Sequence, residues 1–304
     1  MDNLKGAALM VAAMAFFAIE DMYVKKLAGV ISVGMLLTLL GIGGGTVFAV
    51  IAKAQGRRLL TRELLSRPVM LRNAGEMVGT LGFVFALALT PISSASAILQ
   101  ANPLAVTVLA ALFLGAPVGW RRWSAILVGF LGVLLILRPG LDGFQPASLF
   151  AVQGVIGLAV RDVATRACPP TVSSMQLSSY GFFSIVPVGL TLLAFHEPSA
   201  LPQGGGWLLM GAALLAGVLG YYMIVAAMRI GDVAVVTPFR YTRLIFALIT
   251  GYFVFGERPD MITLVGAGIV VASGIYTLWR EARTASAARQ AARRAAASPV
   301  RPTA

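Results

Sequence analysis

The sequence AIEDMYVK at residues 18–25 returns as AVRDVATR at residues 159–166. The matched positions share one offset (162 − 21 = 141), and they are Ala18 with Ala159, Asp21 with Asp162, and Lys25 with Arg166. The same register, with a slip of one residue near the end, also matches Gly79 with Gly220, Ala86 with Ala227, Gly132 with Gly274, and Arg138 with Arg280. A register that holds across half the chain predicts an internal repeat.

The repeat lies in a chain that is too apolar to be a soluble globule. Of its 304 residues, 58% are hydrophobic and 12% are charged, whereas a soluble domain carries about 25% charged residues. A membrane helix needs roughly 20 largely apolar residues. Runs of that kind lie at approximately 4–25, 32–53, 69–89, 93–115, 122–138, 145–166, 172–195, 206–228, 233–255 and 260–280. The sequence therefore predicts an all-α membrane protein with ten transmembrane helices.

The repeat divides these ten helices into two inverted units. Each unit holds five spans, an odd number, so the second copy enters the membrane from the opposite side. We expect a first five-helix repeat at residues 1–141, a second at 142–280, and a basic cytoplasmic tail at 281–304. Secondary transporters bind substrate near the midplane between inverted repeats. The alternative is a gene duplication that serves packing alone.

The net charge of +12 follows from topology if the N-terminus is cytoplasmic. Only Lys25, Lys26, Arg138 and Arg258 then lie in segments on the opposite side. The cytoplasmic set is Lys5, Lys53, Arg57, Arg58, Arg62, Arg67, Arg121, Arg122, Arg166, Arg229, Arg280, Arg283, Arg289, Arg293, Arg294 and Arg301. This bias fits the positive-inside rule, so nucleic-acid binding is not expected. Both termini should face the cytoplasm of a bacterial-type inner membrane, and the tail either extends the last helix or is disordered.

The sharpest functional signal is a set of ionisable residues inside the predicted spans. Such a group at the bilayer centre costs about 2.5–3.5 kcal/mol on insertion scales, and it usually faces a cavity or a partner. The set is Glu20, Asp21, Arg72, Glu76, Arg161, Asp162, Arg240 and Arg243. We expect Arg240 and Arg243, deep in one span, to line a cavity; structural ion pairs are the alternative. For Arg72 and Glu76, four residues apart, that alternative is an intrahelical pair.

Aromatic and amide side chains accompany these charges. Phe239 and Tyr241 flank Arg240, and the other members are Phe16, Phe17, Tyr23, Tyr221, Tyr222, Gln100, Asn102 and Gln176. Ordinary packing is the alternative role of each aromatic residue. The expected substrate-binding set is Arg240, Arg243, Tyr241, Glu20, Asp21, Glu76, Arg161, Asp162, Gln100 and Asn102. Arginine, acid and aromatic groups together suit an organic solute with a charged end and a ring or apolar part.

Several kinds of chemistry lack the residues that they need. The chain has no GxxxxGK[ST] loop, so intrinsic ATP hydrolysis is not expected. Its one cysteine, Cys168, and its one histidine, His196, lie in loops predicted on opposite sides, so neither a metal site nor a nucleophile–base pair is expected. We therefore expect no enzyme activity and no cofactor. Glu20, Asp21, Glu76 and Asp162 are candidate proton carriers, because desolvation favours protonated carboxyl groups.

Two pairs of stretches resemble a known family. The first pair is ALALTPISSASAILQANPLAVTVLAALFLG (86–115) and WRRWSAILVGFLGVLLILRPG (120–140); the second is GDVAVVTPFRYTRLIFALITGYFVFGERPD (231–260) and LVGAGIVVASGIY (264–276). Because of these stretches and their spacing along the chain, residues 4–280 resemble the EamA type of the drug/metabolite transporter superfamily. Phe255, Gly256 and Glu257 match the recurring turn of this family, while the earlier turn departs from it with Ala116 in place of the acid.

The resemblance implies ten helices in two repeats, a central cavity, and proton-linked or facilitative movement of small metabolites. The segment TPFRY at 237–241, with Asp21 and Lys25, resembles the branch that includes S-adenosylmethionine uptake carriers, and bacterial riboflavin carriers have a similar architecture. We therefore expect a secondary transporter that works by alternating access. Its expected partners are a small metabolite and the lipid bilayer, with protons and a second copy of the chain as candidates. A membrane scaffold, a sensor or a channel is the alternative.

Overall fold

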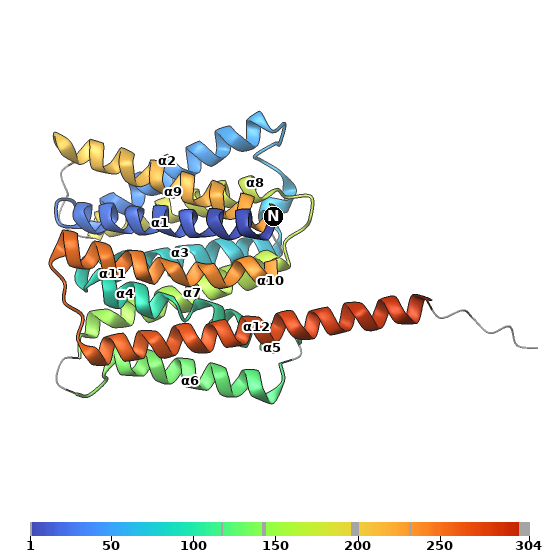
Figure 1. The fold of residues 1–304 in the computed structure, drawn as a ribbon. Coiled ribbons are helices and arrows are strands. Elements are labelled where there is room, and N and C mark those ends of the chain that lie inside the picture. The colour runs from blue at the N-terminus through green and yellow to red at the C-terminus, as the bar shows by residue number, and fades with distance from the viewer. Residues whose placement is uncertain (1, 117, 142–143, 196–200, 231–232, 298–304) are drawn as a thin grey trace, which may run out of the picture.

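The computed structural model describes residues 2–116, 118–141, 144–195, 201–230 and 233–297, and within these ranges every regular element is a helix (Figure 1). The first half comprises α1 (Asp2–Ala28), α2 (Val33–Ala54), η1 (Arg62–Leu65), α3 (Arg67–Leu89), α4 (Ile92–Leu99), α5 (Asn102–Leu114) and α6 (Trp120–Leu137). The second half comprises η2 (Pro146–Ser148), α7 (Leu149–Arg166), α8 (Ser174–Phe195), α9 (Gly205–Ile230), α10 (Val233–Val236), η3 (Thr237–Tyr241), α11 (Thr242–Phe255) and α12 (Met261–Ala297).

The helical membrane class is confirmed, but the number of apolar spans is smaller than predicted. Within the described residues, 8 helical segments are long and apolar enough to cross a membrane, with α4 and α5 together forming one. The predicted third span is the 23-residue helix α3, in which Arg72, Asn73 and Glu76 lower the mean hydropathy. The predicted ninth span is divided among α10, η3 and α11.

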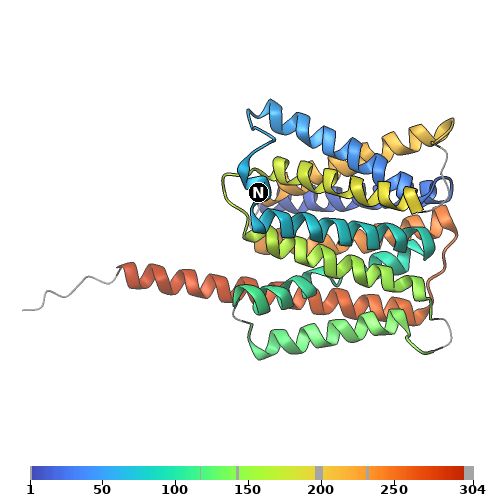
Figure 2. The ribbon, with the colours of Figure 1, turned by 180° about the vertical axis from the view of Figure 1, so that it is seen from behind.

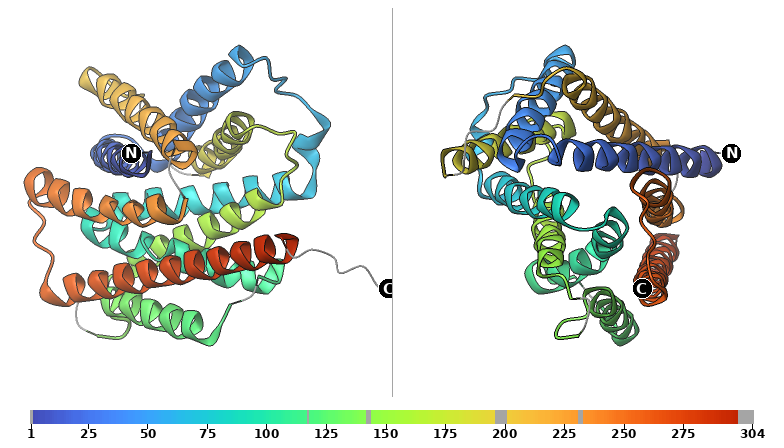
Figure 3. Two further views of the ribbon diagram at one scale, coloured as in Figure 1. Left: turned by 45° about the vertical axis from the view of Figure 1, so that its right-hand side comes forward. Right: turned by 90° about the vertical axis from the view of Figure 1, so that its left-hand side faces the viewer.

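The two halves of the chain interdigitate instead of forming separate lobes. The most extensive contacts join α1 with α9, α2 with α8, α3 with α7, and α6 with α12. Each of these pairs combines one helix from either half, and the views from behind and from the sides show the same mixing (Figures 2 and 3). A surface enclosed by the bundle is therefore built by both halves at once.

Close backbone contact between α3 and α7 explains one glycine pair. A Cβ atom built on Gly157 would lie 2.3 Å from the Gly79 backbone nitrogen, and one built on Gly75 would lie 2.7 Å from the Arg161 nitrogen. Small residues permit such an approach between membrane helices. Because the backbones touch, charged side chains on these two helices can meet in the interior.

Two predicted helices are broken near the middle of the bundle. The run predicted at 93–115 is interrupted at Gln100 and Ala101, just before Pro103, and the run predicted at 233–255 contains the 3₁₀ turn η3, with Pro238 near its start. Proline has no N–H to donate to the preceding turn, which weakens the helix at both interruptions. Broken helices inside transporter bundles place free backbone groups and side chains at substrate sites.

The bundle has two ends that hold different segments of the chain. The end at the left of Figure 1 holds the turn after α1, Arg138 and residues 256–260, and we call it the Glu257 end. The opposite end holds the N-terminus and Gly115, and we call it the N-terminal end. At that end α12 continues beyond the bundle as helix to Ala297 (Figure 1). The helical alternative for the tail therefore holds as far as Ala297.

Candidate functional site

A cavity of about 360 Å³ lies between the two halves. Its wall comes from α1, α2, α3, α7, α8, α9, η3 and α11, together with Leu99 at the end of α4. All of the ionisable residues predicted inside the spans line this one cavity: Glu20, Asp21, Arg72, Glu76, Arg161, Asp162, Arg240 and Arg243. The sequence-based expectation that these charges share an interior space thus agrees with the geometry.

Arg243 and Asp21 form a two-pronged ion pair between the halves. Arg243 lies in the first turn of α11, and its Nη2 is 2.7 Å and 2.8 Å from the two carboxylate oxygens of Asp21 on α1; its Nε donates at 3.1 Å. The guanidinium also lies 5.4 Å from the ring centres of Phe17 and Phe83. Paired hydrogen bonds of this kind are strong and fix the orientation of both groups.

A second group of charges joins α3 to α7. Glu76 lies 3.4 Å from the Arg72 guanidinium and 3.2 Å from that of Arg161. Arg161 also contacts the neighbouring Asp162 at 2.8 Å, and the amide of Asn102 donates to Asp162 at 3.1 Å. Positive and negative groups alternate along this network, so each carboxylate has a cationic partner. The intrahelical pair of Arg72 and Glu76 is present as part of it.

Two ionisable groups on the cavity wall form no close ion pair. Across the described ranges, no side chain of opposite charge lies within 4.0 Å of Glu20 or of Arg240. Glu20 lies against α9, where a Cβ atom on Gly217 would be 2.6 Å from its Oε1. Arg240 belongs to η3, and its backbone carbonyl accepts a hydrogen bond from Gln100 at 3.5 Å. One acid and one base are therefore left facing the space.

The remaining predicted residues lie behind the wall. Gln100 and Asn102 do not line the cavity but bond to groups that do. Tyr241 is only 5% exposed and lies outside the cavity lining, against Gly274 of α12. Successive residues of a 3₁₀ turn point about 120° apart, so Arg240 and Tyr241 cannot share a direction. The structure thus separates Tyr241 from the charged groups that it was expected to join.

Aromatic and hydroxyl groups complete the wall. Phe48 lies 5.4 Å from Phe182 and 4.8 Å from Tyr221, measured between ring centres, and these rings come from α2, α8 and α9. Thr80 and Ser178 also line the cavity. Tyr221 stood out in the sequence; the others carried no signal, since phenylalanine and hydroxyl residues are common in apolar helices. Gln176 instead donates to the Arg58 carbonyl at 2.6 Å, and Tyr222 is 67% exposed.

The two residues noted for enzyme chemistry lie apart from the cavity. Cys168 is half-buried in the connection after α7 and is not part of the cavity wall. Burial raises the pKa of its thiol above the ordinary value, which keeps the less nucleophilic protonated form. His196 lies outside the described residues. Within the described ranges, no group of three or more histidine, cysteine or acidic residues has the arrangement of a metal site.

Comparison with known proteins agrees with this architecture. The model of the EamA-like transporter family matches residues 4–138 and 145–279. An S-adenosylmethionine uptake transporter of Rickettsia felis is 27% identical over 223 residues, which cover 73% of this chain and 75% of the relative. A riboflavin transporter of Vibrio cholerae is 32% identical over 213 residues, covering 69% and 71%.

Two further similarities cover more of the chain. The pseudopaline exporter CntI of Pseudomonas aeruginosa is 24% identical over 281 residues, covering 90% of this chain and 96% of the relative. A solved crystal structure with 19% sequence identity superimposes with a TM-score of 0.60 over 88% of this chain and 94% of that one. That last likeness shows the fold alone. With the family model matching most of its length and a charged cavity between its halves, this multi-pass membrane protein is a small-metabolite transporter that belongs to the EamA-like transporter family.

Proposed function

We propose that this transporter binds a zwitterionic metabolite with a ring system in the central cavity. The observation that carries the proposal is the pair of unpartnered charges, Glu20 on α1 and Arg240 on η3. A cargo with a cationic group for Glu20 and an anionic group for Arg240 would compensate both. Buried ionisable groups are most stable as charges when they are directly paired, so a neutral solute would leave both groups without an ion-pair partner in contact.

The aromatic part of the wall supports a ring in the cargo. Phe48, Phe182 and Tyr221 form one aromatic cluster, and Phe17 and Phe83 flank the Arg243 guanidinium. Aromatic faces stack on planar rings and attract cations. A cavity of about 360 Å³ is within the range of small-molecule sites.

Among the cargoes named for relatives, S-adenosylmethionine fits this wall better than riboflavin. It carries an ammonium group, a carboxylate and a sulfonium on an adenosine, whereas riboflavin is uncharged at neutral pH. The S-adenosylmethionine uptake transporter of Rickettsia felis is 27% identical to this chain. S-adenosylmethionine is accordingly the first cargo to test.

We further propose that the cargo moves by alternating access between two inverted repeats, residues 1–141 and 142–280. Exchanging the repeats turns the contact of α1 with α9 into the contact of α7 with α3, and it leaves the α2–α8 and α6–α12 contacts unchanged. That pattern supports two equivalent halves that can exchange conformations. The distribution of lysine and arginine supports cytoplasmic termini in an inner membrane.

A proton is the proposed coupling ion. Glu20 is the cavity carboxylate without a cation within 4.0 Å among the described residues. It is therefore the group best placed to exchange a proton for a cationic cargo. Because the proton is exchanged for the cargo, uptake into proteoliposomes should rise when the lumen is made more acidic than the outside. It should fall when a protonophore removes this gradient. Uptake that ignores both treatments would exclude this coupling.

Binding experiments on the purified protein test the cargo assignment group by group. Wild-type protein should bind S-adenosylmethionine more tightly than its decarboxylated analogue, and Arg240→Gln should abolish that difference. Glu20→Gln should weaken both ligands, because both keep the ammonium group. Tighter binding of riboflavin than of S-adenosylmethionine would contradict the charge assignment. Flux separates the classes of protein: a carrier saturates and shows counterflow, a channel does not saturate, and a scaffold shows no flux.

A further inference from the structure

An acid-rich turn ties the two halves together at the Glu257 end of the bundle. The Glu257 carboxylate accepts hydrogen bonds from the backbone nitrogens of Ile92 at 2.7 Å and Ser93 at 3.0 Å, and from the Ser93 hydroxyl at 2.7 Å. It therefore caps the start of α4, where free N–H groups favour an anion. Lys25 Nζ lies 3.8 Å from the same carboxylate. One side chain from the second half thus holds two helices of the first.

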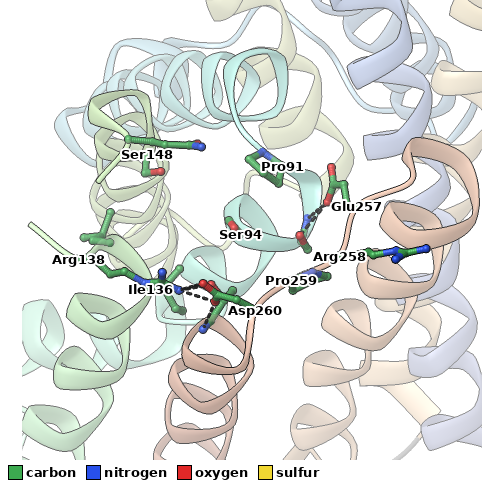
Figure 4. A pocket seen from close by; sticks show the side chains of 13 residues that line it. Pro91, Ser94, Ile136, Arg138, Ser148, Glu257, Arg258, Pro259 and Asp260 are labelled. Atoms are coloured by element: carbon green, nitrogen blue, oxygen red, sulfur yellow. Dashed lines mark hydrogen bonds and ion pairs between the residues drawn. The ribbon is translucent and has the colours of Figure 1, made fainter. Parts of the chain in front are cut away.

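A second tie lies in the same turn. Asp260 accepts a backbone hydrogen bond from Thr263 at 2.8 Å and pairs with Arg138, which follows α6 (Figure 4). The hydrogen bond from the Arg138 guanidinium lowers the pKa of the Asp260 carboxyl well below its usual value, so this carboxyl stays ionised at neutral pH. Figure 4 shows both ties at the edge of one polar pocket of about 340 Å³.

The contacts of Glu257 and Lys25 lie at the buried end of the cavity. Lys25 Nζ also donates to the carbonyls of Leu87 at 3.0 Å and Thr90 at 2.5 Å, and Leu87 itself lines the cavity as a buried residue. Toward the N-terminal end the lining includes Thr165, an exposed residue in the last turn of α7. The cavity therefore opens toward the N-terminal end.

The matching turn of the first half has the same backbone but no acid. Gly115 ends α5 with φ 63° and ψ 24°, and Gly256 ends α11 with φ 65° and ψ 19°. The following residue donates its N–H to Ala110 in one case and to Gly251 in the other, at 3.2 Å and 2.9 Å. This donating residue is Ala116 in the first turn and Glu257 in the second.

We propose that Glu257 and Lys25 form a one-sided latch, which makes closure of the Glu257 end the resting state of the carrier. The first-half turn has Ala116 at the position of Glu257, so the same tie cannot form at the N-terminal end. The two conformations that alternating access requires are therefore unequal in energy. The inference concerns which end is closed, and it holds for any cargo.

Cysteine accessibility tests the latch without any cargo. In a Cys168→Ser background, Thr80→Cys places a reporter thiol on the cavity wall. In vesicles of defined orientation, a membrane-impermeant maleimide should label it from the N-terminal end and only slowly from the Glu257 end. Glu257→Gln should raise labelling from the Glu257 end about tenfold, the change expected for losing one charge-assisted bond.

Two further variants keep the result interpretable. Glu257→Gln also weakens the cap of α4, so Lys25→Gln, which leaves the Glu257 cap in place, should give a change in the same direction. Arg258→Gln alters charge in the same turn without removing either tie, and it should label like the parent. An unchanged pattern in both Glu257→Gln and Lys25→Gln, in protein that remains monodisperse, would overturn the latch. A failure of S-adenosylmethionine to bind would not affect it.

Discussion

At the scale of single residues, the decisive feature is that buried charges compensate one another across the two halves. Asp21 and Arg243 are 222 positions apart in sequence, yet three hydrogen bonds join them in the cavity. Removing only one partner of such a buried pair strongly destabilises the protein, because the remaining charge stays buried without its partner. The pair is therefore both a structural tie and part of the wall that a cargo meets.

Arg243→Ala should abolish flux while leaving the protein inserted in the membrane. Leaving Asp21 unpaired should also lower the free energy of unfolding by about 3–5 kcal/mol. Proteoliposome flux and thermal unfolding in detergent measure the two effects, and Arg57→Ala on an exposed connection is the control. Wild-type flux in Arg243→Ala would remove this residue from the site.

The Asp21→Asn/Arg243→Gln double variant should be more stable than Arg243→Ala. It leaves neutral groups that can still form hydrogen bonds, so no buried charge lacks a partner. The comparison by thermal unfolding shows how much of the loss comes from the stranded carboxylate. If the double variant is less stable than both Asp21→Asn and Arg243→Gln alone, the two side chains stabilise the protein through packing and not through charge.

At the same scale, hydropathy and chemistry identified the charged residues but not their partners. Every ionisable residue predicted inside a span lines the cavity, because charge in an apolar run has few other places to go. Which groups are left unpaired, Glu20 and Arg240, depends on side-chain directions in α1 and η3. The direction of Arg240 follows from the break before α11, which the apolar pattern of 233–255 did not reveal.

At the scale of helices, glycine contacts set how closely the halves approach. Gly75 and Gly79 are spaced four residues apart, as small residues are in close contacts between membrane helices, and both meet the backbone of α7. The breaks at Gln100 and η3 were not predicted, although Pro103 and Pro238 were visible. A proline in an apolar run is compatible with a kink or with a break, and tertiary contacts decide between them.

Gly157→Ala should destabilise the bundle by about 1–3 kcal/mol, because its new methyl group would overlap the α3 backbone. The added atom would lie 2.3 Å from the Gly79 nitrogen. Gly211→Ala is the matched control, since no heavy atom outside its own helix backbone lies within 4 Å of the added carbon. The midpoint of thermal unfolding should be lowest for Gly157→Ala, and that of Gly211→Ala should equal or exceed the midpoint of the parent. Equal stability of the two variants would contradict the close contact.

At the scale of the whole molecule, the offset of 141 residues predicted pairs of corresponding helices, and the contacts between halves are consistent with it. The sequence could not predict which end of the bundle is closed. That property depends on Glu257 reaching α4, a contact 165 positions away in the chain. The sequence shows only that Ala116 stands where the second half has Glu257. The structure adds that the two turns share one backbone conformation, so the two residues occupy equivalent positions.

Ala116→Glu should shift the carrier toward the state that is closed at the N-terminal end. The new carboxylate would occupy the position that corresponds to Glu257, with Arg166 at the position that corresponds to Lys25. Labelling of the Thr80→Cys reporter from the N-terminal end should fall, and labelling from the Glu257 end should rise. Ala116→Gln, of nearly equal size but uncharged, should show a smaller effect. Identical labelling in both variants would argue against an electrostatic tie.

Conformations of unequal energy affect the kinetics of transport without changing the concentration ratio that is reached at equilibrium. With the proposed latch, a solute arriving at the Glu257 end meets a binding-competent form only in the minority of molecules that are open there, so half-saturation at that face requires a higher concentration than at the other face. Without a coupled ion, the same carrier must still bring the concentrations on both sides to equality. The half-saturation concentration measured in one direction thus depends on the conformational equilibrium as well as on the affinity of the site. Measurements in both directions are needed to obtain that affinity.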